Sequence, residues 1–144
     1  MAKSTPEGKV KDKIKKTIKA LGFWYYMPSQ NGMGVSGIPD LIVCAGGLFI
    51  GIETKAPGKL ANVTPNQQAR IDEINGAGGL AVVTDDPVAT GLALRAVKTL
   101  LERESVCSPS RLRAVYLATL QAGKAAGYDD ALLDRVINGT KIWQ

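Results

Sequence analysis

The sequence predicts an α/β domain in which helices flank a mixed β-sheet, followed by a helical extension at the C-terminus. Three observations predict this class. Helical and strand-like segments alternate along the chain, Ala45-Gly46-Gly47 joins two short apolar runs as a turn would, and a helical segment separates the third strand from the fourth. The 144 residues suffice for one hydrophobic core, and we expect residues 1–105 to form the main domain and 106–144 the extension.

The individual elements follow from capping residues, periodicity and turn residues. Thr5-Pro6 is a typical helix start, and the apolar stripe after it ends at Gly22. Residues 28–37 are rich in glycine, serine and asparagine and predict a loop. The expected elements are a helix over 5–22, strands over 23–27, 40–45 and 48–55, a helix over 64–77, a strand over 79–85, a helix over 87–104, and two helices after about residue 108.

The composition excludes several kinds of chemistry. The chain has no histidine, which rules out Ser–His and Cys–His nucleophile pairs, histidine metal sites and an imidazole base. Its two cysteines, Cys44 and Cys107, cannot complete a structural zinc site without histidine. Any chemistry must therefore use carboxylates, lysines, tyrosines or a metal ion held by oxygen.

The formal charge of +5 is concentrated at the N-terminus. Residues 1–22 contain seven lysines and two carboxylates, a net charge of +5, so the remainder of the chain is neutral. Such a helix is suited to binding nucleic acid, and equally to keeping the protein in solution. The segment is too basic for a signal peptide and no apolar run is long enough to cross a bilayer, so we expect a cytoplasmic protein.

Charged residues lie at the ends of the predicted hairpin. Strand alternation places Glu53 and Lys55 on one face, about 7 Å apart, and the hairpin would bring Asp40 beside them. Two neighbouring carboxylates repel each other and favour a bound cation, and oxygen ligands suit Mg²⁺ or Mn²⁺. The alternative is that Asp40 is a turn residue and that the other two are solvated at a strand end.

Two helical residues share the inner faces of their helices with apolar residues. Glu7 lies three positions before Val10, and Gln67 lies four positions before Ile71. A carboxylate on such a face needs a cation or water as a partner. The alternatives are that Glu7 only interacts with the helix dipole and that Gln67 only forms a capping box with Thr64.

Taken together, these residues resemble a known nuclease superfamily. Gly37-Ile38-Pro39-Asp40 followed by Gly51-Ile52-Glu53-Thr54-Lys55 resembles the PD-(D/E)xK signature. The segments GIPDLIV, IETKAPGKL and TPNQQARIDEI, with Glu7 on the first helix, resemble its VRR-NUC branch in small stand-alone phage and bacterial proteins. The resemblance covers about residues 5–85 and implies a restriction-endonuclease-like core that hydrolyses phosphodiester bonds with a divalent metal.

The resemblance also implies a role for each matching residue. Asp40 and Glu53 would be the central ligands of Mg²⁺ or Mn²⁺, with Glu7 and the backbone carbonyl of Thr54 as further ligands. Lys55 would position the attacking water, and Gln67 would support Lys55 or the site. The family often has valine where this chain has Thr54, and we expect the threonine side chain to point to the opposite face.

The resemblance further implies the substrate and the assembly. Proteins of this type are similar to Holliday junction resolvases, which favours a homodimeric, metal-dependent DNA endonuclease acting on branched DNA. We expect phosphate contacts from Lys9, Lys13 and Lys16 on the first helix and from Lys59 on the loop after the motif. Two alternatives remain: a nicking or single-strand nuclease without junction preference, and a catalytically silent DNA-binding module.

Overall fold

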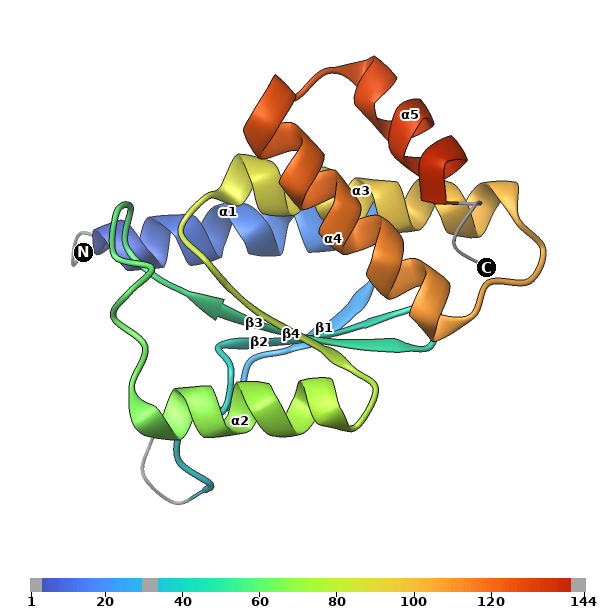
Figure 1. The fold of residues 1–144 in the computed structure, drawn as a ribbon. Coiled ribbons are helices and arrows are strands. Elements are labelled where there is room, and N and C mark those ends of the chain that lie inside the picture. Colours follow the sequence, from blue (N-terminus) through green and yellow to red (C-terminus); the bar gives the residue numbers. More distant parts are fainter. Residues whose placement is uncertain (1–3, 30–33, 141–144) are drawn as a thin grey trace.

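A computed structural model describes residues 4–29 and 34–140 of the chain (Figure 1). The predicted loop 28–37 is described only in part, because residues 30–33 lie outside the described residues. The observed elements are α1 (Pro6–Leu21), β1 (Trp24–Tyr26), β2 (Leu41–Ala45), β3 (Leu48–Thr54), α2 (Pro65–Gly76), β4 (Leu80–Thr84), α3 (Pro87–Arg103), α4 (Pro109–Ala126) and α5 (Asp130–Thr140). The predicted α/β class, with a mixed sheet and a C-terminal helical extension, is confirmed.

The four strands form one sheet in the order β1-β2-β3-β4. The pairs β1–β2 and β2–β3 are antiparallel, whereas β3 and β4 are parallel and are connected through α2. Gly46 and Gly47 both have positive φ values, of 59° and 87°, as a tight hairpin turn between β2 and β3 requires. The parallel pairing brings the C-terminal ends of β3 and β4 to the same edge of the sheet, with Thr54 opposite Thr84.

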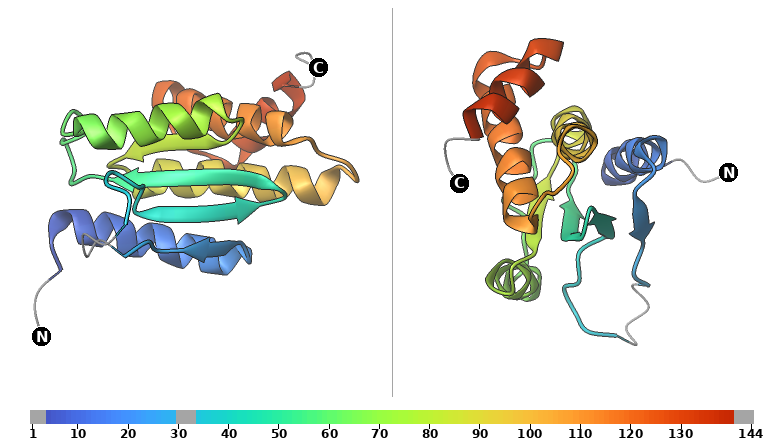
Figure 2. Two further views of the ribbon diagram at one scale, coloured as in Figure 1. Left: turned by 90° about the horizontal axis from the view of Figure 1, so that it is seen from below. Right: turned by 90° about the vertical axis from the view of Figure 1, so that its right-hand side faces the viewer.

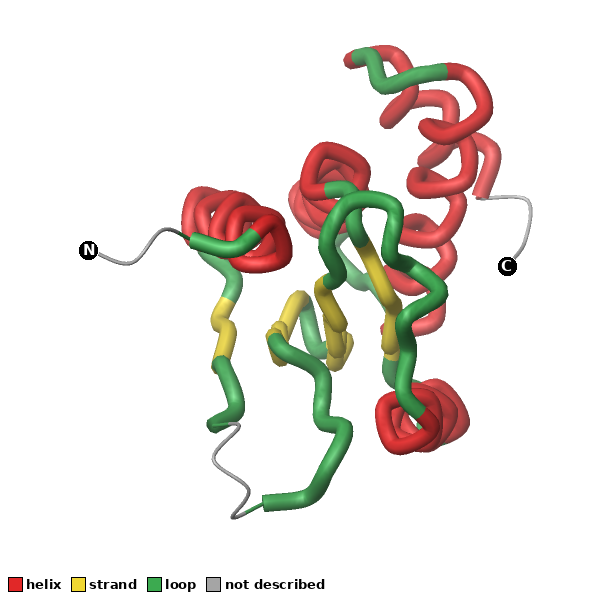
Figure 3. The backbone as a smooth tube through the Cα atoms, turned by 90° about the vertical axis from the view of Figure 1, so that its left-hand side faces the viewer, coloured by secondary structure: helices red, strands yellow, loops and turns green. Residues whose placement is uncertain are grey.

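Helices cover both faces of the sheet (Figure 3). One face packs against α1, α3 and α4, while α2 lies on the other face beside β4. The sheet residues that face the first layer are fully buried, for example Val43, Ile50 and Ile52. On the α2 face, β1 and β2 carry exposed side chains such as Trp24 and Cys44, because α2 covers only the half of the sheet near β4.

The helices begin and end where capping groups satisfy their backbone. The Thr5 hydroxyl accepts a hydrogen bond from the Gly8 amide at 3.0 Å, and α1 stops at Gly22, which has a left-handed backbone. The helices α4 and α5 pack on α3, and their residues Leu112, Tyr116 and Leu132 belong to the same hydrophobic core as the sheet. Among the described residues, no helix combines the length and the apolar character needed to span a membrane.

Candidate metal centre

Asp40 lies immediately before β2, where the antiparallel ladder with β3 ends. The last register pair is Leu41 with Ile52, so the amide of Thr54 has no β2 backbone partner. The Asp40 carboxylate takes that place: its Oδ2 accepts hydrogen bonds from the Thr54 amide at 2.9 Å and from the Thr54 hydroxyl at 2.8 Å. These two bonds fix the orientation of the Asp40 side chain and direct its other oxygen, Oδ1, toward further partners.

Two glycines explain how the chain reaches this position. Gly37 has a φ of 84°, and a Cβ atom there would lie 2.4 Å from the backbone of Asn66 at the start of α2. A Cβ atom on Gly51 would lie 3.0 Å from the ring of Pro39. The segment before Asp40 therefore packs tightly between α2 and β3, which accounts for both glycines of the motif.

Glu53 lies near the C-terminal end of β3 on the face toward α2, and its side chain is buried. Its Oε1 accepts a hydrogen bond from Nε2 of Gln67 at 2.8 Å and lies 3.5 Å from Nζ of Lys55. Lys55 in turn donates to Oε1 of Gln67 at 3.0 Å. The Gln67 amide thus bridges the carboxylate and the amine and holds both in fixed positions.

Gln67 also takes part in the capping box of α2. The Thr64 hydroxyl accepts from the Gln67 amide at 3.2 Å, and Oε1 of Gln67 accepts from the Thr64 amide at 3.0 Å. The two interpretations of this residue were therefore not exclusive. The helix start anchors the side chain, and the anchored side chain organises Glu53 and Lys55.

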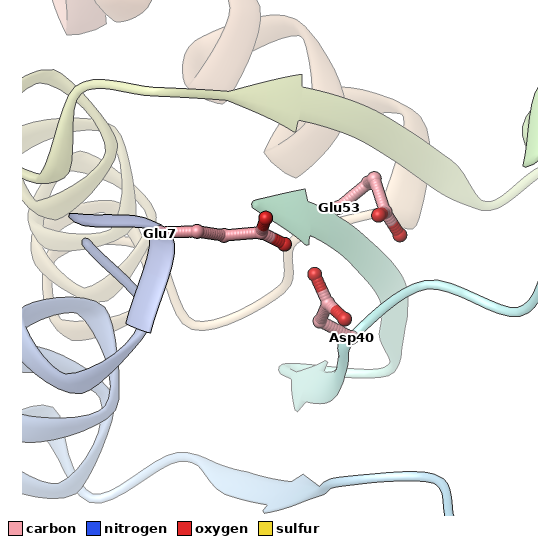
Figure 4. A group of neighbouring side chains, drawn as sticks. All are labelled: Glu7, Asp40 and Glu53. Atoms are coloured by element: carbon pink, nitrogen blue, oxygen red, sulfur yellow. The ribbon is translucent and has the colours of Figure 1, made fainter. Parts of the chain in front are cut away.

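Glu7, in the first turn of α1, completes a group of three carboxylates with Asp40 and Glu53, here called the acidic trio (Figure 4). The three side chains point toward one another, and each offers an oxygen within 4.8 Å of the others. Oxygens on opposite sides of one Mg²⁺ lie about 4.2 Å apart, twice the usual Mg–O distance. Small side-chain rotations would therefore let the acidic trio hold a single divalent cation.

The surroundings of Glu53 raise its pKa from the ordinary 4.5 to about 7. Burial is the largest cause and the negative charge of Asp40 is the second, while the nearby Lys55 ammonium acts in the opposite direction. Glu7 adds a further negative charge that raises the pKa. Without a cation, the acidic trio is therefore under electrostatic strain at neutral pH, and a bound divalent cation would relieve it.

This strain predicts how the stability of the metal-free protein depends on pH. The folded state holds the Glu53 proton more tightly than the unfolded chain, so stabilisation that is complete below the unfolded pKa of 4.5 is lost as the pH rises toward 7. Glu53→Gln removes this titration and keeps an oxygen to accept the Gln67 N–H. In EDTA, we expect the unfolding temperature of the parent to fall relative to that of the variant by on the order of 5 °C between about pH 5 and about pH 8.

Thermal unfolding followed by circular dichroism at several pH values measures this difference. A parent–variant difference that stays constant across the range would show that Glu53 titrates alike in the folded and unfolded states.

The structure adds two contacts to the expected site. The Thr54 side chain was expected on the face opposite Glu53 and Lys55, and its hydroxyl nevertheless donates a hydrogen bond to Asp40 at 2.8 Å. Lys11 contacts the site as well, with Nζ 3.5 Å from Oδ1 of Asp40. Its position four residues after Glu7, on the same face of α1, was the available sequence signal.

The lysines expected to contact phosphate lie on the surface, outside the acidic trio. Lys9, Lys13 and Lys16 are exposed and share one face of α1, which lies roughly 120–180° around the helix from Glu7. Lys59 is exposed on the loop between β3 and α2. All four side chains are accessible to a ligand that approaches the molecule from outside.

The fold and the site together define an α/β protein with a buried carboxylate–lysine–glutamine cluster at one edge of its sheet. No protein-family model matches the sequence, and no curated protein matches it significantly.

Proposed function

We propose that this protein is a metal-dependent DNA endonuclease of the VRR-NUC branch of the PD-(D/E)xK superfamily. One observation carries the proposal. Carboxylates from α1, from the segment before β2 and from β3 converge within 4.8 Å, beside a buried lysine held by Gln67. Asp40 and Glu53 each have a lysine amine at 3.5 Å, and the three acidic groups still face one another.

The order of elements supports the proposal. A helix, three antiparallel strands, a second helix and a parallel strand carry Glu7, Asp40, Glu53 and Gln67 in the sequence positions that the nuclease resemblance implies. The glycines of both motifs also have specific packing roles next to these residues. A chance match of two short motifs would not explain why the structure places all of these residues together.

The oxygen-only donor set fits Mg²⁺ or Mn²⁺, which Asp40, Glu53, Glu7 and the carbonyl of Thr54 would hold. Such a cation offsets the charge of the scissile phosphate and lowers the pKa of water. Lys55 would orient the attacking water and stabilise negative charge that develops on the phosphate. Gln67 would keep the Lys55 amine in place, and Thr54 would fix Asp40 through its two hydrogen bonds.

We further propose that the substrate is branched DNA and that the protein acts in the cytoplasm as a homodimer. Symmetric cutting of the two strands of a junction requires two active sites related by a two-fold axis. A catalytically silent DNA-binding module would not need the complete set of Asp40, Glu53, Lys55 and Gln67.

The decisive experiment offers labelled four-way junction, flap, duplex and single-stranded DNA to the protein with Mg²⁺, Mn²⁺ or EDTA. We expect cleavage only with metal, and fastest on the branched substrates. Cutting in EDTA would contradict the metal site. Equal rates on all DNAs would support the nicking or single-strand alternative. Light scattering coupled to size exclusion tests the dimer, and a monomer at micromolar concentration would contradict it.

A further inference from the structure

A groove follows the seam where α1 packs against α3, and the C-terminal helical segment borders it. Two adjoining cavities of about 290 and 560 Å³ form the groove and share Thr17 and Arg95 in their linings. Figure 2 (right) shows the two helices side by side on the same face of the sheet. A Cβ atom on Gly91 would lie 3.5 Å from Thr17, so α1 and α3 are in close contact along the floor of the groove.

Four cationic side chains line this groove. Lys13 and Lys16 come from α1, and Arg95 and Lys98 come from α3, each pair spaced three residues apart on one helical face. Within the part of the chain that the structure describes, none of the four forms an ion pair. Glu102 is the single carboxylate among the described lining residues. The described lining of the groove therefore carries a net positive charge, four cations against one carboxylate.

Along the helix axes, the groove starts at the end of the molecule that holds the acidic trio, and its lysines on α1 lie roughly 120–180° around that helix from Glu7. Glu7 lies in the first turn of α1, and α3 begins at Pro87, three residues after Thr84, which pairs with Thr54 in the sheet. The α3 side of the groove runs from Val88 to Glu102, which at the helical rise corresponds to about 21 Å. At about 3.4 Å per nucleotide of one strand, this length matches roughly six phosphates.

We propose that this groove binds the sugar–phosphate backbone of one nucleic-acid strand that extends from the acidic trio. The inference rests on the proposed nuclease function and adds to it a path for the strand. The charge of the groove is complementary to a polyanion, and its cations form no ion pair among the described residues; Lys98 lies over the Phe23 ring, 5.9 Å from its centroid. Arg95 and Lys98 join Lys13 and Lys16 in a single binding surface.

The test compares two double variants that remove the same charge from different surfaces. Lys13→Ala with Arg95→Ala removes one cation from each wall of the groove. Lys19→Ala with Lys124→Ala removes two exposed cations outside the groove lining. Fluorescence anisotropy measures the affinity of each full-length protein for a labelled single-stranded oligonucleotide in EDTA, at several salt concentrations between about 50 and about 200 mM.

We expect the groove variant to bind more weakly and its salt slope to become shallower by about 1.4, the value for two lost phosphate contacts on a single strand. The control variant should keep a slope close to that of the parent. Equal slopes for the two variants, or unchanged binding by the groove variant, would overturn the proposal. Unfolding temperatures equal to that of the parent establish that both variants are folded.

Binding in EDTA separates this inference from the proposed function. If the protein binds through the groove but never cuts with metal, the proposed nuclease function is wrong and the groove proposal stands. If the protein cuts with metal but binds independently of Lys13 and Arg95, only the groove proposal is wrong.

Discussion

We expect Asp40→Asn to reduce metal-dependent DNA cleavage by about 10³-fold while the protein remains folded. The metal contribution to charge stabilisation amounts to several kcal/mol, and each 1.36 kcal/mol corresponds to a factor of ten in rate. The asparagine oxygen can still accept the hydrogen bonds from the amide and hydroxyl of Thr54. The substitution therefore removes the negative charge and preserves the contacts that shape the strand end.

Asp85→Asn provides a matched control for this prediction. Asp85 follows β4 at the same edge of the sheet and accepts a hydrogen bond from the Gly58 amide at 2.8 Å, outside the acidic trio. Its substitution removes the same charge and should leave the cleavage rate near that of the parent. Rates are measured on the preferred branched substrate with saturating Mg²⁺ and Mn²⁺. If Asp40→Asn cuts as fast as Asp85→Asn, Asp40 does not hold the metal.

Gln67→Ala should lower the cleavage rate by about 10- to 100-fold, which is the usual effect of removing a residue that orients groups at a metal site. The variant loses the hydrogen bonds of Gln67 to Glu53 and Lys55 at once. The Lys55 amine would then lose its neutral partner and turn toward the carboxylate of Glu53. Helix α2 would also lose half of its capping box, so a stability effect is expected in addition.

Thr64→Ala separates the two effects. This variant loses the hydroxyl of the capping box, at a cost of about 1 kcal/mol, and leaves the Gln67 amide beside Glu53 and Lys55. We expect both variants to lose stability in thermal unfolding, Gln67→Ala by more because it also removes the hydrogen bonds to Glu53 and Lys55, and we expect a loss of rate only in Gln67→Ala. Equal rates in both variants would assign Gln67 a purely structural role.

The sequence predicted the elements of this fold because their signals are local. Thr5-Pro6 and Thr64-Pro65 mark helix starts, Gly46-Gly47 marks the hairpin turn, and the observed bounds from α1 to α3 differ from the predicted ones by at most one residue. Strand alternation also placed Glu53 and Lys55 on one face correctly. These signals depend only on residues a few positions apart in the chain, so they do not depend on how the elements pack.

The contacts within the candidate site depended on tertiary structure. The hydrogen bonds from Thr54 to Asp40 arise because the β2–β3 ladder ends at the pair Leu41–Ile52, before it reaches Thr54, and the Lys11 contact depends on the position of α1 relative to Asp40. Gln67 could be assigned to a capping box from its spacing to Thr64, but its reach to Glu53 and Lys55 required the position of α2 on the sheet.

By itself the sequence determined the order and type of the elements, the lysine-rich first helix and the side chains available for chemistry. The packing of the helices decided which of those side chains meet. It brought Glu7 to Asp40 and Glu53, and it aligned Lys13 and Lys16 with Arg95 and Lys98 across the α1–α3 seam. The physical reason is that periodicity fixes the face on which a residue lies, whereas the position and angle of one element against another depend on how the whole core packs.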